Sequence, residues 1–215
     1  MTDAISPTRR GAGRPTREQA EARHRELLDT ALKLFLENGF EMTTVEMIAK
    51  RVGMTKRTVY ARYPDKAALF LTAVQRAIER QIVPRDVLED LDRGDLAETL
   101  EAIGRLRIGQ VMTPDGLRLQ RVINAEGYRF PTIFKANVEQ SARPLIEFVA
   151  GLLDRAIAAG DIAPTDTGLA ANAFMSMVVG GSVRAIVSGS TPTSEQLDRK
   201  VHFTVHLLLD GLRPR

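Results

Sequence analysis

The sequence contains no cysteine, and aromatic residues make up only 5% of its 215 positions. Without cysteine the chain has no disulfide, no thiolate nucleophile and no cysteine-ligated zinc site. Alternating runs of β-branched and aromatic residues are also missing, so the sequence predicts no β-sheet. The longest uncharged stretch, residues 167–183, falls short of the ~20 apolar residues that a membrane-spanning helix needs. Residues 1–25 are polar and lack the apolar core of a signal peptide. We therefore expect a cytoplasmic protein with no membrane partner.

Leucine and alanine dominate the apolar residues, and charge is unevenly distributed along the chain. Leucine and alanine favour helices. Residues 1–80 contain 15 lysines and arginines against 10 acidic residues, whereas residues 81–215 contain 15 against 17. The positive excess indicates that a polyanion would dock on the first third of the chain, although a solvated basic surface would give the same excess.

Caps and apolar spacing predict an all-α fold of about nine helices. The first is expected over residues 16–38, with a capping box formed by Thr16 and Gln19 and a stop at Gly39. Thr43 and Glu46 are expected to form a second capping box. The further helices are expected over residues 43–52, 55–62, 66–81, 95–112, 114–128, 131–159 (with a break near Pro144), 165–188 and 194–211.

The strongest functional signal is the pair of short helices over residues 43–52 and 55–62, which are joined at Gly53. Two short helices joined by a tight glycine turn are typical of a helix-turn-helix. At 100° per residue, Val59 and Tyr63 share the side of the second helix that can pack inward. An arginine on the other side can bind guanine, hydroxyls can reach phosphate, and an alanine leaves room in a major groove. That outward side of the predicted recognition helix, residues 55–62, carries Arg57, Thr58, Tyr60 and Ala61.

Residues 27–70 resemble the DNA-binding region of the tetracycline-repressor (TetR) family. The resemblance rests on Ala31-x-x-Leu34-Phe35, Gly39-Phe40, Thr43-Thr44, Ile48-Ala49, Gly53, Lys56, Thr58-Val59-Tyr60, Tyr63, Lys66 and Leu69-Phe70. It implies base or backbone contacts from Thr55, Lys56, Arg57, Tyr60, Ala61 and Arg62, and phosphate contacts from Thr44 and Lys66. Arg57 stands where many members have glycine, Arg62 where histidine is common, and Ala68 where glutamate often completes a helix cap. These departures leave the operator sequence open.

The motif divides the chain into a flexible basic arm (residues 1–15), a three-helix helix-turn-helix domain (16–80) and a helical bundle for ligand binding and dimerisation (81–215). The arm contains Arg9, Arg10 and the tripeptide Gly13-Arg14-Pro15, which resembles arms that read the minor groove. Arginine inserted into a narrow A·T-rich minor groove is one mode of readout. The alternative is a disordered tail with incidental arginines, and the sequence does not decide between the two.

Dimerisation is the first function expected of residues 81–215. A single short recognition helix reads too few base pairs, so such proteins pair across a two-fold axis and bind palindromic DNA. The family resemblance favours a four-helix homodimer interface built from residues 165–188 and 194–211. In the second segment, an apolar stripe is formed by Leu197, Val201, Val205 and Leu208/Leu209. The alternative is that both helices are buried core.

Binding of a small hydrophobic effector is the second expected function. Residues 116–131 resemble the C-terminal domain of an AefR-like TetR subgroup, and TetR-like proteins bind small molecules among their central helices. Methionine and aromatic side chains suit an apolar ligand. The alternative is that these residues are ordinary core. The candidate effector contacts are Met112, Arg121, Glu126, Phe130, Phe134 and Met175.

Catalytic motifs are missing: the sequence has no glycine-rich phosphate loop, no serine elbow and no paired-carboxylate motif. His202 and His206 are spaced i, i+4 on one helix and could ligate a metal, but no third ligand is apparent, so an interface or surface role is favoured. We therefore expect no enzyme, metal or cofactor. The expected function is a repressor that a ligand releases from a palindromic operator in the nucleoid. A DNA-binding module of a recombinase-like enzyme and a helical protein-binding adaptor are the alternatives.

Overall fold

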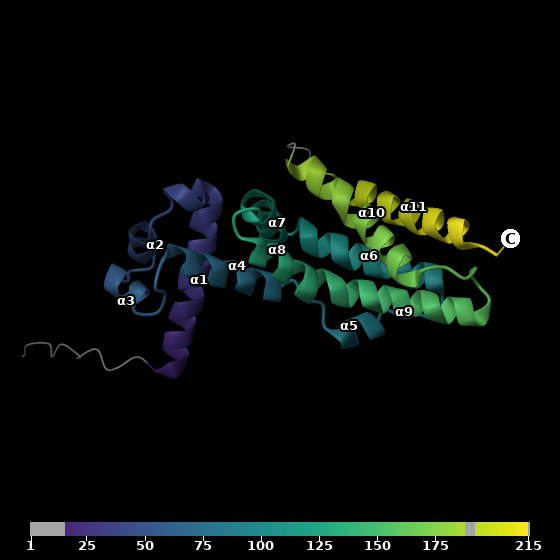
Figure 1. Ribbon diagram of the computed structural model, residues 1–215, viewed down its shortest axis with the longest axis horizontal. Coiled ribbons are helices and arrows are strands. Elements are labelled where there is room, and N and C mark those ends of the chain that lie inside the picture. Colours follow the sequence, from purple (N-terminus) through teal and green to yellow (C-terminus); the bar gives the residue numbers. More distant parts are fainter. Residues whose placement is uncertain (1–15, 188–191, 215) are drawn as a thin grey trace, which may run out of the picture. The chain divides into compact units, whose positions relative to one another are not determined.

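The computed structural model describes residues 16–187 and 192–214, and within them every regular element is a helix (Figure 1). The expected all-α fold is confirmed. The chain divides into two compact units, Met1–Leu69 and Phe70–Arg215. The expected arm, with Arg14, lies outside the described residues. The elements are α1 (Arg17–Met42), α2 (Val45–Arg51), α3 (Lys56–Tyr60), α4 (Lys66–Glu79), α5 (Arg85–Glu89), α6 (Leu96–Met112), α7 (Pro114–Glu126), α8 (Pro131–Asn137), the π-helical turn η1 (Val138–Ala142), α9 (Arg143–Ala159), α10 (Thr167–Val187) and α11 (Ser194–Leu212).

Helix α1 begins as the sequence predicts but continues beyond the predicted stop. The Thr16 hydroxyl oxygen accepts the Gln19 N–H at 3.2 Å, and the Gln19 side chain accepts the Thr16 N–H at 3.0 Å. Gly39 has a φ of +78°, which glycine adopts without the strain that a Cβ would cause. The helix is kinked there rather than ended, and it continues to Met42.

The second predicted capping box is wrong by one residue. Thr43 is fully buried, and its hydroxyl donates to the carbonyl oxygens of Leu34 at 3.0 Å and Gly39 at 2.8 Å. Thr44 is the N-cap of α2, and its hydroxyl oxygen accepts the Met47 N–H at 3.1 Å. Both threonines carry a suitable cap oxygen, and the burial of Thr43 against the kink of α1 decides between them.

Helix α5 and the turn η1 are two short elements of the second unit. The sequence does not predict α5, because a single turn shows no apolar periodicity. The break expected near Pro144 is confirmed, since η1 separates α8 from α9. Proline lacks a backbone N–H and its ring crowds the preceding turn, and a π turn accommodates that disruption.

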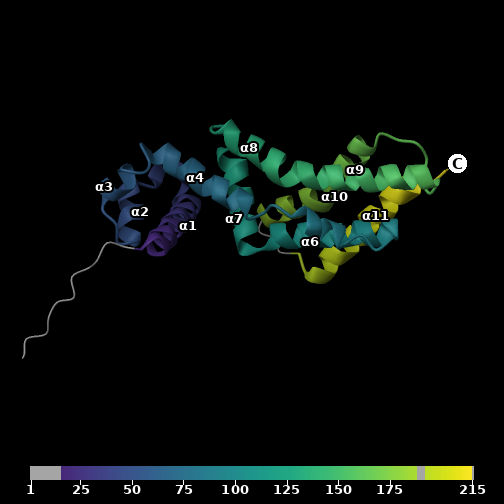
Figure 2. The same ribbon diagram turned by 90° about the horizontal axis from the view of Figure 1, so that it is seen from below.

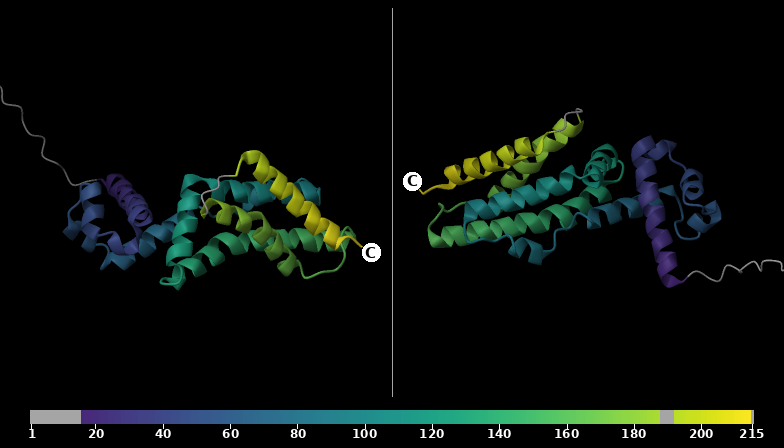
Figure 3. Two further views of the ribbon diagram at one scale, coloured as in Figure 1. Left: turned by 90° about the horizontal axis from the view of Figure 1, so that it is seen from above. Right: turned by 180° about the vertical axis from the view of Figure 1, so that it is seen from behind.

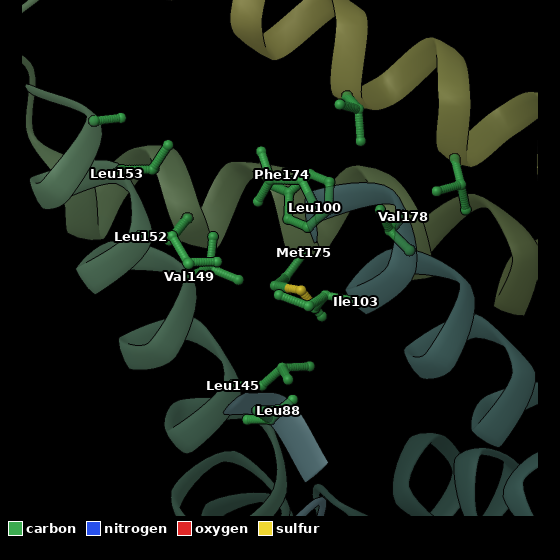
Figure 4. Packing of buried hydrophobic residues seen from close by; sticks show 14 of the residues in the cluster. Leu88, Leu100, Ile103, Leu145, Val149, Leu152, Leu153, Phe174, Met175 and Val178 are labelled. Carbon is green, nitrogen blue, oxygen red and sulfur yellow. The ribbon is translucent and has the colours of Figure 1, made fainter. Parts of the chain in front are cut away.

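The second unit is a helical bundle in which α6 packs against α7, α9, α10 and α11 (Figures 2 and 3). Helix α10 lies along both α9 and α11. In the core, Leu100 and Ile103 of α6 face Phe174 and Met175 of α10 (Figure 4). None of the helices in the described ranges is long and apolar enough to cross a membrane.

Candidate functional site

Helices α2 and α3 form the predicted helix-turn-helix inside the first unit. Gly53 lies between them with a φ of +63°, a left-handed conformation that residues with a Cβ rarely adopt. The Met54 N–H donates to the carbonyl oxygen of Ala49 at 2.9 Å, and the Gly53 N–H donates to that of Lys50 at 3.3 Å. These bonds satisfy carbonyls at the end of α2. The tight turn therefore depends on glycine at this position.

Helix α3 has the two faces that the sequence predicts. Thr55 is its N-cap: the Thr55 hydroxyl oxygen accepts the Thr58 N–H at 3.1 Å and lies 2.8 Å from the Thr58 hydroxyl. Val59 is 1% exposed and Tyr63 is 6% exposed, which places both in the core as expected. The outward side carries exposed residues only, namely Lys56, Arg57, Thr58, Tyr60, Ala61 and Arg62.

A contact between Tyr63 and His24 ties the end of this motif to α1, and sequence reasoning missed it. The Tyr63 hydroxyl is hydrogen-bonded to Nε2 of His24, and the two rings are stacked with centroids 6.1 Å apart. Burial raises the pKa of the Tyr63 phenol, and the charge of Arg62 lowers it in part. Tyr63 therefore keeps its proton at neutral pH and can donate to the imidazole.

Thr44 and Lys66, the two residues expected to contact phosphate, both have partners within the protein. The Thr44 hydroxyl caps α2. The Lys66 ammonium donates to the carbonyl oxygens of Phe40 at 2.8 Å and Glu41 at 3.1 Å, and it lies 4.4 Å from the centroid of the Phe40 ring. These carbonyls lie at the C-terminal end of α1, where the helix dipole favours a cation. Lys66 therefore has a structural role, and its phosphate contact stays a prediction.

The start of α4 shows how the chain compensates for Ala68. The Ala68 N–H donates to a carboxylate oxygen of Asp65 at 2.7 Å. An aspartate at this position satisfies a free N–H of the first turn. The helix is therefore capped without the glutamate that the family resemblance led us to look for.

The six predicted effector contacts differ in their exposure, and Glu126 among them is half-buried. Met175 is buried in the core and Met112 packs against that core, whereas Arg121 is exposed and Phe134 is 57% exposed. Phe130 packs on Phe70 with ring centroids 5.1 Å apart. A pocket of about 310 Å³ in this unit is lined instead by Leu71, Thr72, Gln75, Ile78, Thr132 and Ile133.

Arg107 is a buried charge that sequence reasoning missed. The residue is 5% exposed, and burial lowers the pKa of its guanidinium. Its hydrogen bond is to the amide oxygen of Gln110 at 3.4 Å, and no carboxylate among the described residues pairs with it. An uncompensated buried charge is costly. The signal that could have found it is its spacing, four residues after Ile103 and four before Val111, both of which are buried on α6.

The apolar residues that α10 and α11 expose are not those of the stripe expected at the dimer interface. Val201 and Val205 are fully buried inside their own chain, so these two residues cannot face a partner, whereas Leu197, Leu208 and Leu209 of the stripe are only partly buried. Gly104 of α6 lets α11 approach closely, because a Cβ at Gly104 would lie 2.8 Å from Cγ1 of Val201. Among the side chains of α10 and α11 that the structure describes, the exposed large apolar ones are Leu169 (68%), Phe203 (66%) and Leu207 (52%).

Two family models match the chain. Residues 27–73 match the bacterial regulatory proteins of the tetR family, and residues 98–211 match the AefR-like transcriptional repressor C-terminal domain. The first match covers the helix-turn-helix and the second covers α6 to α11 almost completely.

Curated relatives match over part of their length. The HTH-type transcriptional regulator Mb1581 of Mycobacterium bovis is 35% identical over 96 residues, which is 44% of this chain and 45% of that protein. The HTH-type transcriptional repressor Rv1474c of Mycobacterium tuberculosis is 33% identical over 97 residues, which is 40% of this chain and 52% of that protein. The chain thus matches about half the length of these relatives.

Solved structures match over nearly the whole chain. The flavonoid-responsive regulator FrrA is 29% identical, with a TM-score of 0.68 over 91% of this chain and 99% of that one. A TetR family transcriptional regulator from Pseudomonas syringae pv. tomato is 21% identical, with a TM-score of 0.68 over 94% of this chain and 100% of that one. At that identity the second likeness shows the fold alone.

Proposed function

Because this chain belongs to the tetR family of bacterial regulatory proteins and carries an AefR-like C-terminal domain, we propose that it is a repressor that leaves a palindromic operator when a small effector binds. Members of the family are DNA-binding transcriptional regulators. The proposal places the protein in the cytoplasm, on the nucleoid, and gives it no enzymatic activity. The observation that carries it is the division of α3 into a buried side and a wholly exposed side.

The exposed side of α3 supports direct reading of bases. Nothing among the described residues holds the Arg57 guanidinium, which is therefore available to an external acceptor. A guanidinium can form two parallel hydrogen bonds to O6 and N7 of guanine. Lys56 and Arg62 flank it with further positive charge. Val59 and Tyr63 fix the helix from its other side, so the reading residues are presented on a packed support.

Dimerisation through α10 and α11 accounts for the exposed apolar residues. Large apolar side chains gathered on one surface mark an interaction site. Leu169 of α10 and Phe203 and Leu207 of α11 are the large apolar side chains known to be exposed on the two helices expected to pair. A two-fold dimer would place two recognition helices about 34–36 Å apart, the spacing of half-sites one DNA turn apart. We expect Phe203→Glu to convert the dimer to monomer in sedimentation and to abolish operator binding.

The buried Arg107 supports an effector that is apolar with one acidic group. The core around α6 is apolar, and the Arg107 guanidinium lacks a carboxylate partner within the described residues. A bound carboxylate would supply the missing charge and form strong charge-assisted hydrogen bonds. Such a ligand shifts DNA binding only by the difference between its affinities for the two states of the dimer.

Aromatic carboxylic acids and their methyl esters test the effector class by thermal shift. The acids should raise the melting temperature of the wild type and leave Arg107→Met unchanged, and the esters should have no effect on either protein. Equal stabilisation by acids and esters would remove the argument for an acidic group without touching the DNA-binding proposal.

Retention of fragments from the genome that encodes the protein, followed by sequencing, tests the DNA-binding function. The retained fragments should share an inverted repeat. Arg57→Ala should lose about 1–3 kcal/mol of binding free energy on that repeat and relax the preference at one base pair of each half-site. Lys33→Ala is the control, since its exposed ammonium lies 3.8 Å from Glu37 on α1. Retention without a shared repeat, or strand cleavage or exchange, would contradict the proposal, and no DNA retention would favour a protein-binding adaptor.

A further inference from the structure

The geometry points to a binding site for a divalent transition-metal ion on the surface of the second unit, made by His202 and His206 of α11 and Glu101 of α6. Sequence spacing identified the two histidines and lacked a third ligand. The fold supplies that ligand from a helix about a hundred residues earlier in the chain. This inference is independent of the proposed function.

The three side chains converge at one point. A nitrogen of each histidine and a carboxylate oxygen of Glu101 lie within 4.8 Å of one another. Nδ1 of His202 is 2.6 Å from Oε1 of Glu101, and the two imidazole rings are in edge contact with centroids 4.2 Å apart. Histidines at i and i+4 lie on the same face of a helix. Small side-chain rotations, which the exposure of both histidines permits, bring three ligand atoms to one metal ion.

Glu101 is held in place for this role by a second group. Its other oxygen, Oε2, accepts a hydrogen bond from Arg105 at 2.6 Å, and Nε of Arg105 lies 3.2 Å from Asp198 on α11. Partners of this kind orient a ligating carboxylate. They leave Oε1 directed at His202. When both imidazoles are neutral, the carboxylates of Glu101 and Asp198 outnumber the guanidinium of Arg105. The charge of this group is then net negative, which does not oppose the binding of a divalent cation.

The ligand set selects the class of ion. Two imidazole nitrogens and one carboxylate oxygen suit Zn²⁺, with water in the remaining position, and imidazole also suits Cu²⁺ and Ni²⁺. The ion would bridge α6 and α11, because the ligands come from both. It would bind the folded chain far better than the unfolded one, and so it would stabilise the fold in proportion to its concentration.

The site lies to one side of the exposed apolar surface of α11. His202 contacts Glu101 of α6, whereas Lys200 donates to the carbonyl oxygen of Val178 on α10 at 2.7 Å. At 100° per residue, Phe203 and Leu207 fall on the arc between these two contacts, on the side away from α6. Metal binding therefore leaves the apolar surface free, and the two features can be tested separately.

Titration calorimetry of ZnCl₂ into the full-length chain, freed of any affinity tag and treated with chelator, tests the site. The wild type should bind one Zn²⁺ per chain and melt at a higher temperature with Zn²⁺ than without it. His202→Ala and His206→Ala should each lose the binding and the thermal shift. Glu101→Gln should weaken binding at least tenfold, because an amide is a poorer ligand than a carboxylate. Circular dichroism establishes that each variant is helical.

Arg199→Ala is the matched control, since it changes an exposed side chain on the same helix and should bind Zn²⁺ as the wild type does. The proposal is overturned if the wild type binds no Zn²⁺ at about 100 µM, or if binding survives both histidine substitutions. Binding that depends on the histidines but is equal in Glu101→Gln would also overturn it, because the site would then be the histidine pair alone.

Discussion

Lys66 offers a test that separates a structural role from a DNA-binding role. Its ammonium donates to two carbonyl oxygens at the end of α1, at 2.8 and 3.1 Å, and lies over the Phe40 ring. Hydrogen bonds to charged groups contribute about 1.5–3 kcal/mol each, and the partial exposure of this side chain reduces that range. We expect Lys66→Ala to lower the free energy of unfolding by about 1.5–2 kcal/mol, or the melting temperature by about 3–8 °C.

The assay combines thermal or urea unfolding with DNA binding at several salt concentrations. Lys50→Ala is the matched control for stability, because Lys50 is an exposed lysine of the same unit. If Lys66 also contacts a phosphate, the slope of log K against log salt falls by about 0.9 per protomer. Stability within ~0.5 kcal/mol of the wild type, the usual range for surface substitutions, would refute the structural reasoning. An unchanged salt slope would refute the phosphate contact alone.

Two other predictions concern the contact between α6 and α11. Gly104→Ala should destabilise the chain by about 1–3 kcal/mol, because the added Cβ would lie 2.8 Å from Val201. In a double-mutant cycle with Val201→Ala, the two effects on the free energy of unfolding should be non-additive by at least ~1 kcal/mol. Additivity within about 0.5 kcal/mol would contradict this, because it would show that the contact between α6 and α11 adjusts to the added Cβ without cost. Burial raises the pKa of Glu101, but hydrogen bonds from His202 and Arg105 and their charges outweigh it, so the folded pKa lies below 4.5. The resulting stability is present above about pH 4.5 and is lost as the pH falls through the folded pKa. The melting temperature of Glu101→Gln should therefore depend less on pH below 4.5 than that of the wild type, and parallel curves would contradict this.

The helix-turn-helix could be predicted almost completely because its signals are local. Gly53 and the spacing of Val59 and Tyr63 all lie within a dozen residues, and each has the predicted role. The error at Thr43 shows where local reasoning stops. Thr44 carries the same hydroxyl group and could cap the helix equally well. Only the burial of Thr43 against the kinked end of α1 distinguishes the two threonines.

The proposed dimer surface follows from the sequence only in part, because apolar spacing does not say which side of a helix meets its own chain. Val201 and Val205 form a regular stripe, but α6 already covers it. Phe203 and Leu207 lie beside the stripe and remain exposed. On a helix that packs on its own bundle and is also expected to pair with a second copy, both sides carry apolar residues.

For the same reason, the group of Glu101, His202 and His206 in the second unit could not be predicted from the sequence. Spacing placed His202 and His206 on one face, but the third group depends on which helix packs beside them. Glu101 is brought to them because Gly104, one turn further along α6, allows α11 to approach. Likewise, the role of Lys66 depends on the last residues of α1 beyond the kink at Gly39, where Phe40 and Glu41 supply the accepting carbonyl oxygens. A helix face follows from spacing, whereas its packing partner follows from side-chain volumes across the bundle, and each of these contacts depends on that partner.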